Sequence, residues 1–65
     1  MYKLTVYKYG TFKNATEEAT RFLVLVDHLK ASAARGGFEV TFDDPDEGEL
    51  FKDGVAVAGW HIEEV

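Results

Sequence analysis

The chain has no cysteine, a single proline and no long uninterrupted hydrophobic run among its 65 residues. The missing cysteine excludes disulfides and thiolate zinc sites of the zinc-finger type. The longest strongly apolar run, residues 22–26, is far shorter than the roughly 20 residues that cross a bilayer. No basic and apolar leader is visible at the start, so we expect a cytoplasmic protein with no membrane contact.

Positive charge is also scarce, because seven Lys and Arg residues stand against twelve Asp and Glu residues, for a net charge of −5. This balance argues against a general phosphate-backbone binder, which needs a basic patch. It suits a basic partner, imitation of nucleic acid, or simple solubility. Hydrophobic residues make up 46% of the chain, too many for a disordered tail, so we expect one folded domain over residues 1–65.

Periodicity predicts a strand followed by a helix in the first half of the chain. Residues 2–9 alternate between polar and apolar, with Leu4 and Val6 on the side of the core. Asn14 and Glu17 match a helix-capping pattern, and the glycines at 36–37 match a helix stop, which predicts a helix over residues 14–35. The apolar stripe of this helix would consist of Ala15, Ala19, Phe22, Leu23, Val26, Leu29 and Ala33.

Three further strands are expected in the second half. Residues 38–43 alternate cleanly, residues 43–48 form an acidic loop, and residues 50–52 and 55–62 form a hairpin. Phe38, Val40 and Phe42 would point inward. Asp-Gly at 53–54 is typical of a type I′ turn, which would set Leu50 opposite Val57. In that register Phe51 and Trp60 face the helix, and Leu50 faces away from it. A bulge near Gly59 would shift the register and turn Trp60 outward instead.

The fold class predicted from this order, β-α-β-β-β, is α+β, with a single helix packed on one face of a small four-stranded mixed sheet. The crossover through the helix would make the first two strands parallel, and the last three would form an antiparallel meander. The first strand would then lie beside either the second or the fourth, and the sequence leaves both arrangements open.

Catalytic and metal chemistry have little support in the residues. The only serine, Ser32, shares a helix face with His28 and Asp27, where nothing excludes water. The acidic loop lacks the spacing of a calcium-binding EF-hand, and no phosphate-binding glycine motif is present. We therefore expect a protein that is not an enzyme and that has no catalytic residue, no cofactor and no metal.

An interaction surface is the remaining expectation, since one helix covers only one face of a sheet. We predict a small non-enzymatic protein-interaction module, acting as a homodimer or as an adaptor or inhibitor, that uses its open sheet face and acidic loop. The partner-binding residues would be Tyr7, Tyr9, Asp43, Asp44, Asp46, Glu47, Leu50, Val57 and His61. The alternative is single-stranded nucleic-acid binding through the Lys and Tyr residues of the first strand.

Overall fold

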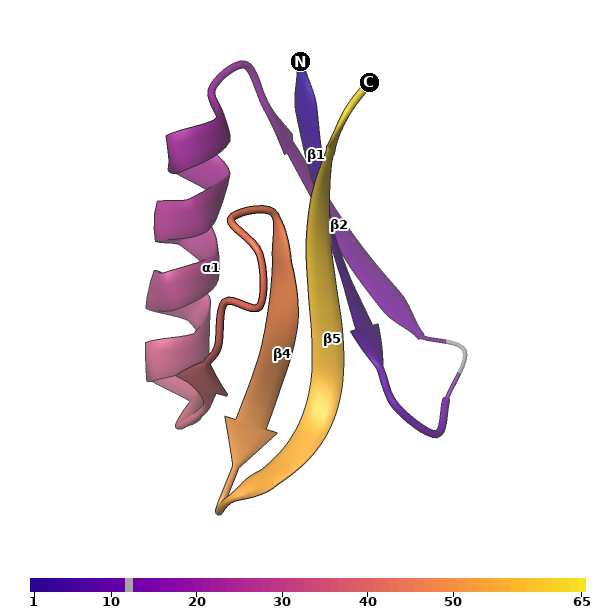
Figure 1. Ribbon diagram of the computed structural model, residues 1–65, viewed down its shortest axis with the longest axis vertical. Coiled ribbons are helices and arrows are strands. Elements are labelled where there is room, and N and C mark those ends of the chain that lie inside the picture. The colour runs from indigo at the N-terminus through magenta and orange to yellow at the C-terminus, as the bar shows by residue number, and fades with distance from the viewer. Residues whose placement is uncertain (12) are drawn as a thin grey trace.

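The computed structural model describes residues 1–11 and 13–65 and has one helix and five strands in these ranges. The elements are β1 (Tyr2–Lys8), β2 (Asn14–Ala19), α1 (Phe22–Gly36), β3 (Glu39–Val40), β4 (Glu47–Lys52) and β5 (Val55–Glu64). The strands form an antiparallel sheet in the order β2-β1-β5-β4-β3, with α1 against one face (Figure 1). The α+β class and the single packed helix are confirmed, whereas the four-stranded mixed sheet is wrong.

The largest correction concerns residues 14–19, which form β2 and not the first turns of the helix. Asn14 pairs with Tyr7 and Ala19 pairs with Tyr2, so β1 and β2 form an antiparallel hairpin. The helix begins at Phe22, and Arg21 before it makes no side-chain capping bond. Between residues 14 and 19 the only apolar side chains are alanines, so a helix here would have buried little. Pairing with β1 therefore outweighs the local capping pattern.

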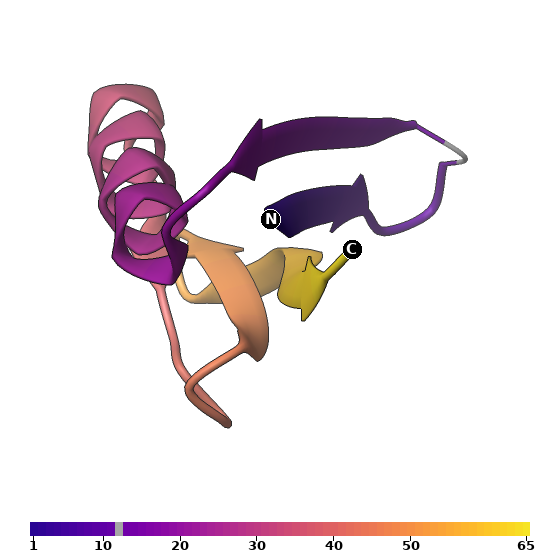
Figure 2. The same cartoon turned by 90° about the horizontal axis from the view of Figure 1, so that it is seen from above.

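This hairpin also removes the parallel crossover. Because β2 reverses the chain before the helix begins, β1 is antiparallel to both of its neighbours. Of the two arrangements that the sequence left open, β1 lies beside the last strand, with Leu4 opposite Ile62 and Val6 opposite Trp60. The sheet is curved, and the end of β2 at the tip of the β1–β2 hairpin lies far from α1 (Figure 2).

The hairpin between β4 and β5 has the expected turn but a different register farther in. Asp53 has a φ of 54° and Gly54 a φ of 80°, which confirms the left-handed pair of a type I′ turn. Phe51 opposes Ala56 as expected, but a bulge next to it sets Leu50 opposite Ala58. One extra residue in a strand reverses which side chains face the core.

The bulge corrects the assignment of Leu50 as an outward, partner-binding residue. Leu50 belongs to the core and is 8% exposed, while Phe51 is half-buried and lies outside the buried cluster. The register shift is favourable because it sets Glu47 and Glu49 opposite His61 and Gly59, so that Leu50 and not these carboxylates faces the core.

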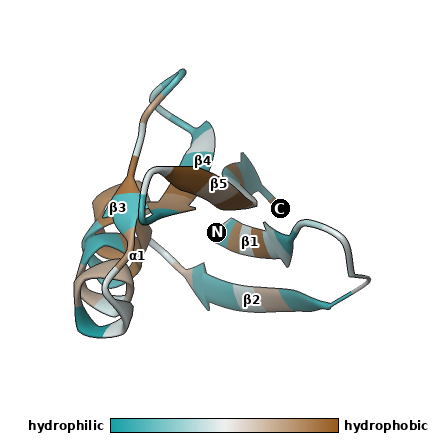
Figure 3. Cartoon of the chain, turned by 90° about the horizontal axis from the view of Figure 1, so that it is seen from below, coloured by the Kyte–Doolittle hydropathy of each residue, from teal (hydrophilic) through white to brown (hydrophobic). Residues whose placement is uncertain are grey.

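The core lies between α1 and the sheet and is centred on Trp60, which is fully buried. Its indole Nε1 donates a hydrogen bond to the carbonyl oxygen of Thr41 at 3.2 Å, and the ring of Phe42 meets it edge-on at 5.1 Å. Buried polar ring atoms need such a partner. The buried side chains are Leu4, Leu25, Val26, Leu29, Ala33, Leu50, Ala58, Trp60 and Ile62. In the hydropathy view, β5 is the most apolar strand of the sheet and β2 is largely polar (Figure 3).

Two other expectations about the core need adjustment. Val26, Leu29 and Ala33 are buried as expected, but Leu25 replaces Leu23, which is 70% exposed. Because Ala15 and Ala19 belong to β2, the buried stripe of α1 follows positions 22, 25, 26, 29 and 33 at helical spacing. Phe42 remains 43% exposed, although its ring touches Trp60. Phe38 and Val40 pack at the edge of the core as expected.

Candidate protein-interaction face

The sheet face away from α1, here called the open face, is formed mainly by β1, β5 and β4. Leu4 and Val6 face α1, so Lys3, Thr5 and Tyr7 point to the other side by strand alternation. On β5, the same alternation sets Val57, Gly59 and His61 on the open face. Tyr7 is opposite Gly59 and Thr5 is opposite His61, so β1 and β5 present one continuous surface.

An aromatic cluster occupies the middle of the open face. The Tyr7 ring lies 5.9 Å from the Tyr9 ring and 6.0 Å from the His61 ring, measured between centroids. Tyr7 also covers Gly59, because a Cβ atom built there would lie 2.5 Å from the Tyr7 ring. A glycine on this strand therefore allows the tyrosine ring to approach the backbone closely. Both tyrosines remain accessible, Tyr7 at 37% and Tyr9 at 42%.

A carboxylate borders the aromatic cluster. The Tyr9 hydroxyl donates a hydrogen bond of 2.9 Å to Oε2 of Glu49, and this bond is the main reason that the pKa of Tyr9 rises to about 12. The Tyr9 backbone N–H donates to the Val57 carbonyl at 3.0 Å, which holds the end of β1 against β5. The predicted partner-binding residues did not include Glu49. Its spacing of two residues from Glu47 is the signal that could have assigned both side chains to one strand face.

The acidic loop joins β3 to β4 at the same end of β4 as Glu47. The N–H groups of Asp43 and Asp44 donate to the Glu47 carbonyl at 3.1 and 3.2 Å, so the loop folds back on itself. A hydrogen bond to the Asp44 carboxyl, together with repulsion from Asp44 and Asp46, raises the pKa of Glu47. The Asp46 carbonyl accepts from the Ile62 N–H at 2.7 Å, which attaches the loop to β5. The loop therefore concentrates exposed negative charge in a fixed position.

The expected partner-binding residues do not all lie in one place. Tyr7, Tyr9, Val57 and His61 come together on the open face, and Glu47 pairs with His61 at its border. Asp43, Asp44 and Asp46 lie in the adjoining loop, and all three are exposed. Leu50 is the exception, because it faces the core on the other side of the sheet.

Within residues 1–11 and 13–65, no cluster of three histidine or acidic side chains is arranged to hold a metal ion. Asp27 and His28 are exposed on α1, and Ser32 on the same helix is half-buried, with a contact to Arg35 Nη2 at 3.3 Å. In the same part of the chain, α1 is too short and too polar to cross a membrane.

Comparison with known proteins places the chain beside phage proteins. The family model described as Mycobacterium phage Gp84-like protein matches residues 1–65. The Gene 84 protein of Mycobacterium phage L5 is 40% identical over 63 residues, which cover 95% of this chain and 96% of that protein. No solved structure matches significantly.

Proposed function

The chain belongs to the Mycobacterium phage Gp84-like protein family, and we propose that it is a small non-enzymatic protein-interaction module of the cytoplasm. In this proposal the open face binds a basic segment of a protein partner, and the chain acts as an adaptor or an inhibitor of that partner. The observation that supports it best is the cluster of exposed Tyr7 and Tyr9 and half-buried His61, bordered by Glu49.

The chemistry of this cluster favours cationic side chains. Faces of tyrosine rings attract lysine and arginine, with arginine the more frequent partner. Glu47 and Glu49 add carboxylates that pair with the same cations. The acidic loop extends this negative field, which would steer a basic partner toward the face. A homodimer through the open face is less favourable, because it would bring the acidic residues of both copies together.

Single-stranded nucleic acid is the alternative ligand of the open face. Tyr7 and Tyr9 could stack on unpaired bases, and Lys3 and Lys8 on β1 could contact phosphates. Glu49, however, is hydrogen-bonded to Tyr9 and would repel the phosphates next to any base stacked there. The protein partner is therefore preferred.

A site-specific photocrosslinking experiment tests the proposal. A photoreactive benzoylphenylalanine replaces Thr5 on the open face, and a matched variant has it at Leu23 on the exposed back of α1. Mycobacterial extract is the chosen source because the family is described from mycobacterial phages. We expect the Thr5 variant alone to crosslink a basic protein, with the yield falling at about 0.5 M salt because charge pairs are screened.

The adduct should also be lost when Tyr7→Ser is added to the Thr5 variant. Equal crosslinking from Leu23, or no adduct at low salt, would contradict the proposal. Two further measurements separate the other ligands. Sedimentation with a mass that rises with concentration and falls in Val57→Glu would indicate a homodimer. Salt-sensitive binding of labelled single-stranded RNA or DNA, weakened by Tyr7→Ala, would indicate nucleic acid.

A further inference from the structure

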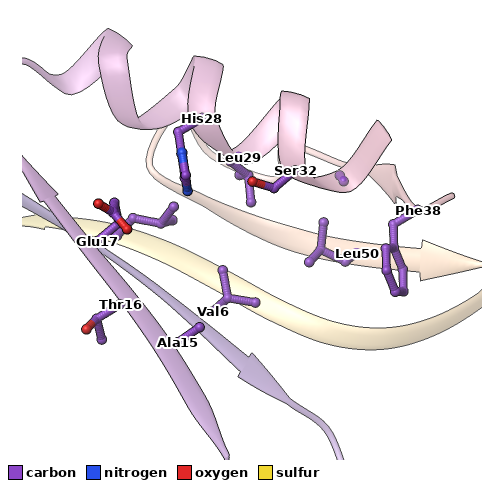
Figure 4. Close-up of a pocket in the computed structure, with 11 residues that line it drawn as sticks. Val6, Ala15, Thr16, Glu17, His28, Leu29, Ser32, Phe38 and Leu50 are labelled. Atoms are coloured by element: carbon purple, nitrogen blue, oxygen red, sulfur yellow. The ribbon is translucent and has the colours of Figure 1, made fainter. Parts of the chain in front are cut away.

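The opposite side of the sheet has a groove that the proposed function does not use. It has a volume of about 260 Å³ and lies between α1 and the hairpin of β1 and β2. Its walls are mainly apolar, with Val6 and Leu50 from the sheet and Leu29 from the helix. In Figure 4, His28 and Ser32 on α1 and Glu17 on β2 lie on either side of its opening.

The strand at the mouth of this groove is an edge strand. β2 is the first strand in the sheet order and pairs only with β1 among the described residues. Lys8 N–H donates to the Lys13 carbonyl at 3.2 Å, so residues 13, 15, 17 and 19 direct their backbone groups toward β1. The backbone groups of Asn14, Thr16 and Glu18 therefore point away from the sheet, where a further strand would bind them.

The arrangement of β2 and α1 leaves room for such a strand. The two elements are close where residues 20–21 join them and diverge toward the tip of the hairpin (Figures 1 and 2). Ala15, Thr16 and Glu17 are exposed at the wider part, directly beside the groove. A strand added to β2 here would direct alternate side chains into the groove, between β2 and α1.

We propose that the free edge of β2 and the adjoining groove bind an extended segment of a protein partner, with alternating apolar and basic residues. The apolar side chains would enter the groove and replace water against Val6, Leu29 and Leu50. The basic side chains would point to the opposite face of this edge and meet Glu18, whereas Glu17, the other charged residue of β2, lies at the mouth of the groove. A second copy of β2 would instead add two more glutamates to this edge.

This site does not depend on the proposed function, because the groove lies on the face of the sheet that carries α1 and the edge of β2 does not include the aromatic cluster. The two sites can therefore be tested separately, since Tyr7 and His61 report on the open face and Thr16 and Ser32 report on the groove.

The test uses synthetic peptides whose ends are acetylated and amidated. The probe is a heptapeptide of alternating lysine and leucine. One control has the same composition with its leucines placed together, and another has N-methyl groups on the backbone donors that would face β2. Amide chemical shifts of the isotope-labelled protein are followed during each titration. We expect saturable shifts at Thr16, Glu18 and Ser32 with the probe, and at least tenfold weaker binding of both controls.

Two protein variants examine the same contacts. Thr16→Pro removes a backbone N–H that points away from the sheet, so it should abolish probe binding while the melting temperature stays nearly unchanged. Ser32→Phe fills the groove beside α1 and should weaken binding more than tenfold, whereas the matched Ser32→Ala should bind like the unaltered protein. The N-methyl control keeps the test valid even where a variant folds poorly.

Several results would overturn the proposal. These are no saturable shift at millimolar probe, equal binding of the N-methylated peptide, or shifts centred on Tyr7 and His61. Sedimentation of the unliganded protein could give one more result of this kind. A dimer that Thr16→Pro converts to a monomer would assign the β2 edge to a second copy of this chain.

Discussion

At the scale of single residues, the open face depends on contacts between side chains far apart in the sequence. Tyr9 and Glu49 are joined by a 2.9 Å hydrogen bond across 40 residues. Tyr7 lies over Gly59, where any Cβ atom would collide with its ring. Residue type alone indicated tyrosines on a strand. Which carboxylate and which glycine they meet depends on how β1, β5 and β4 align.

The bond between Tyr9 and Glu49 predicts an unusual titration. Tyr9 should ionise with a pKa of about 12, above the ordinary value of 10.0, because its hydroxyl donates to a carboxylate. The folded pKa is the higher one, so the small stabilisation from this bond is complete below about pH 10 and is lost as pH rises through 12. Glu49→Gln should return the pKa of Tyr9 toward its ordinary value.

The measurement is the pH dependence of the Tyr9 ring resonances by NMR. Glu47→Gln serves as the control, since Glu47 does not contribute to the shift at Tyr9. An unchanged Tyr9 titration in Glu49→Gln would refute this assignment of the hydrogen bond.

At the scale of elements, local signals predicted turns and helix ends better than they predicted the helix start. Gly37 adopts a φ of 77°, and the helix ends at Gly36 as expected. The capping pattern from Asn14 to Glu17 was misleading, because the same residues also pair well with β1. A capping box contributes about 1 kcal/mol. Forming a hairpin that becomes part of a larger sheet can outweigh this contribution.

The turn between β4 and β5 leads to a prediction at this scale. Gly54→Ala should lower the free energy of unfolding by about 1–2 kcal/mol, the usual cost of a left-handed conformation for a residue with a Cβ atom. Gly54 has a φ of 80°, and nothing lies within 4 Å of the added Cβ, so the cost is conformational and not steric.

Urea denaturation followed by circular dichroism measures this difference. Asp53→Asn is the control, because asparagine tolerates the φ of 54° at that position and should change stability by only a few tenths of a kcal/mol. Equal stability of the alanine variant would argue against the left-handed turn.

At the scale of the whole molecule, stability depends on a few buried side chains. One helix covers one face of the sheet, and Trp60 and Leu25 are the largest side chains that are completely buried. A domain of this size has a free energy of unfolding of only about 3–10 kcal/mol at typical values per residue. Loss of a single core side chain is therefore a large fraction of the total.

Leu25→Ala and Val24→Ala form a matched pair, because these two neighbouring residues of α1 differ sharply in exposure. Leu25 is 1% exposed, and its truncation should cost about 2–5 kcal/mol, enough to unfold much of the protein. Val24 is 52% exposed, and its truncation should change stability by less than about 0.5 kcal/mol. Urea unfolding followed by Trp60 fluorescence measures both. Similar costs for the two variants would contradict the buried face assigned to α1.

The α+β class, the first strand, the type I′ turn and the inward direction of Leu4 can be derived from the amino-acid sequence alone. These follow from local rules, because side-chain period and turn chemistry involve residues only a few positions apart. The three-dimensional fold was needed to show that residues 14–19 form a strand, that β1 lies beside β5, and that a bulge turns Leu50 into the core together with Trp60. Those outcomes depend on which distant strands pair and how much apolar surface each pairing buries, and no local pattern contains that information.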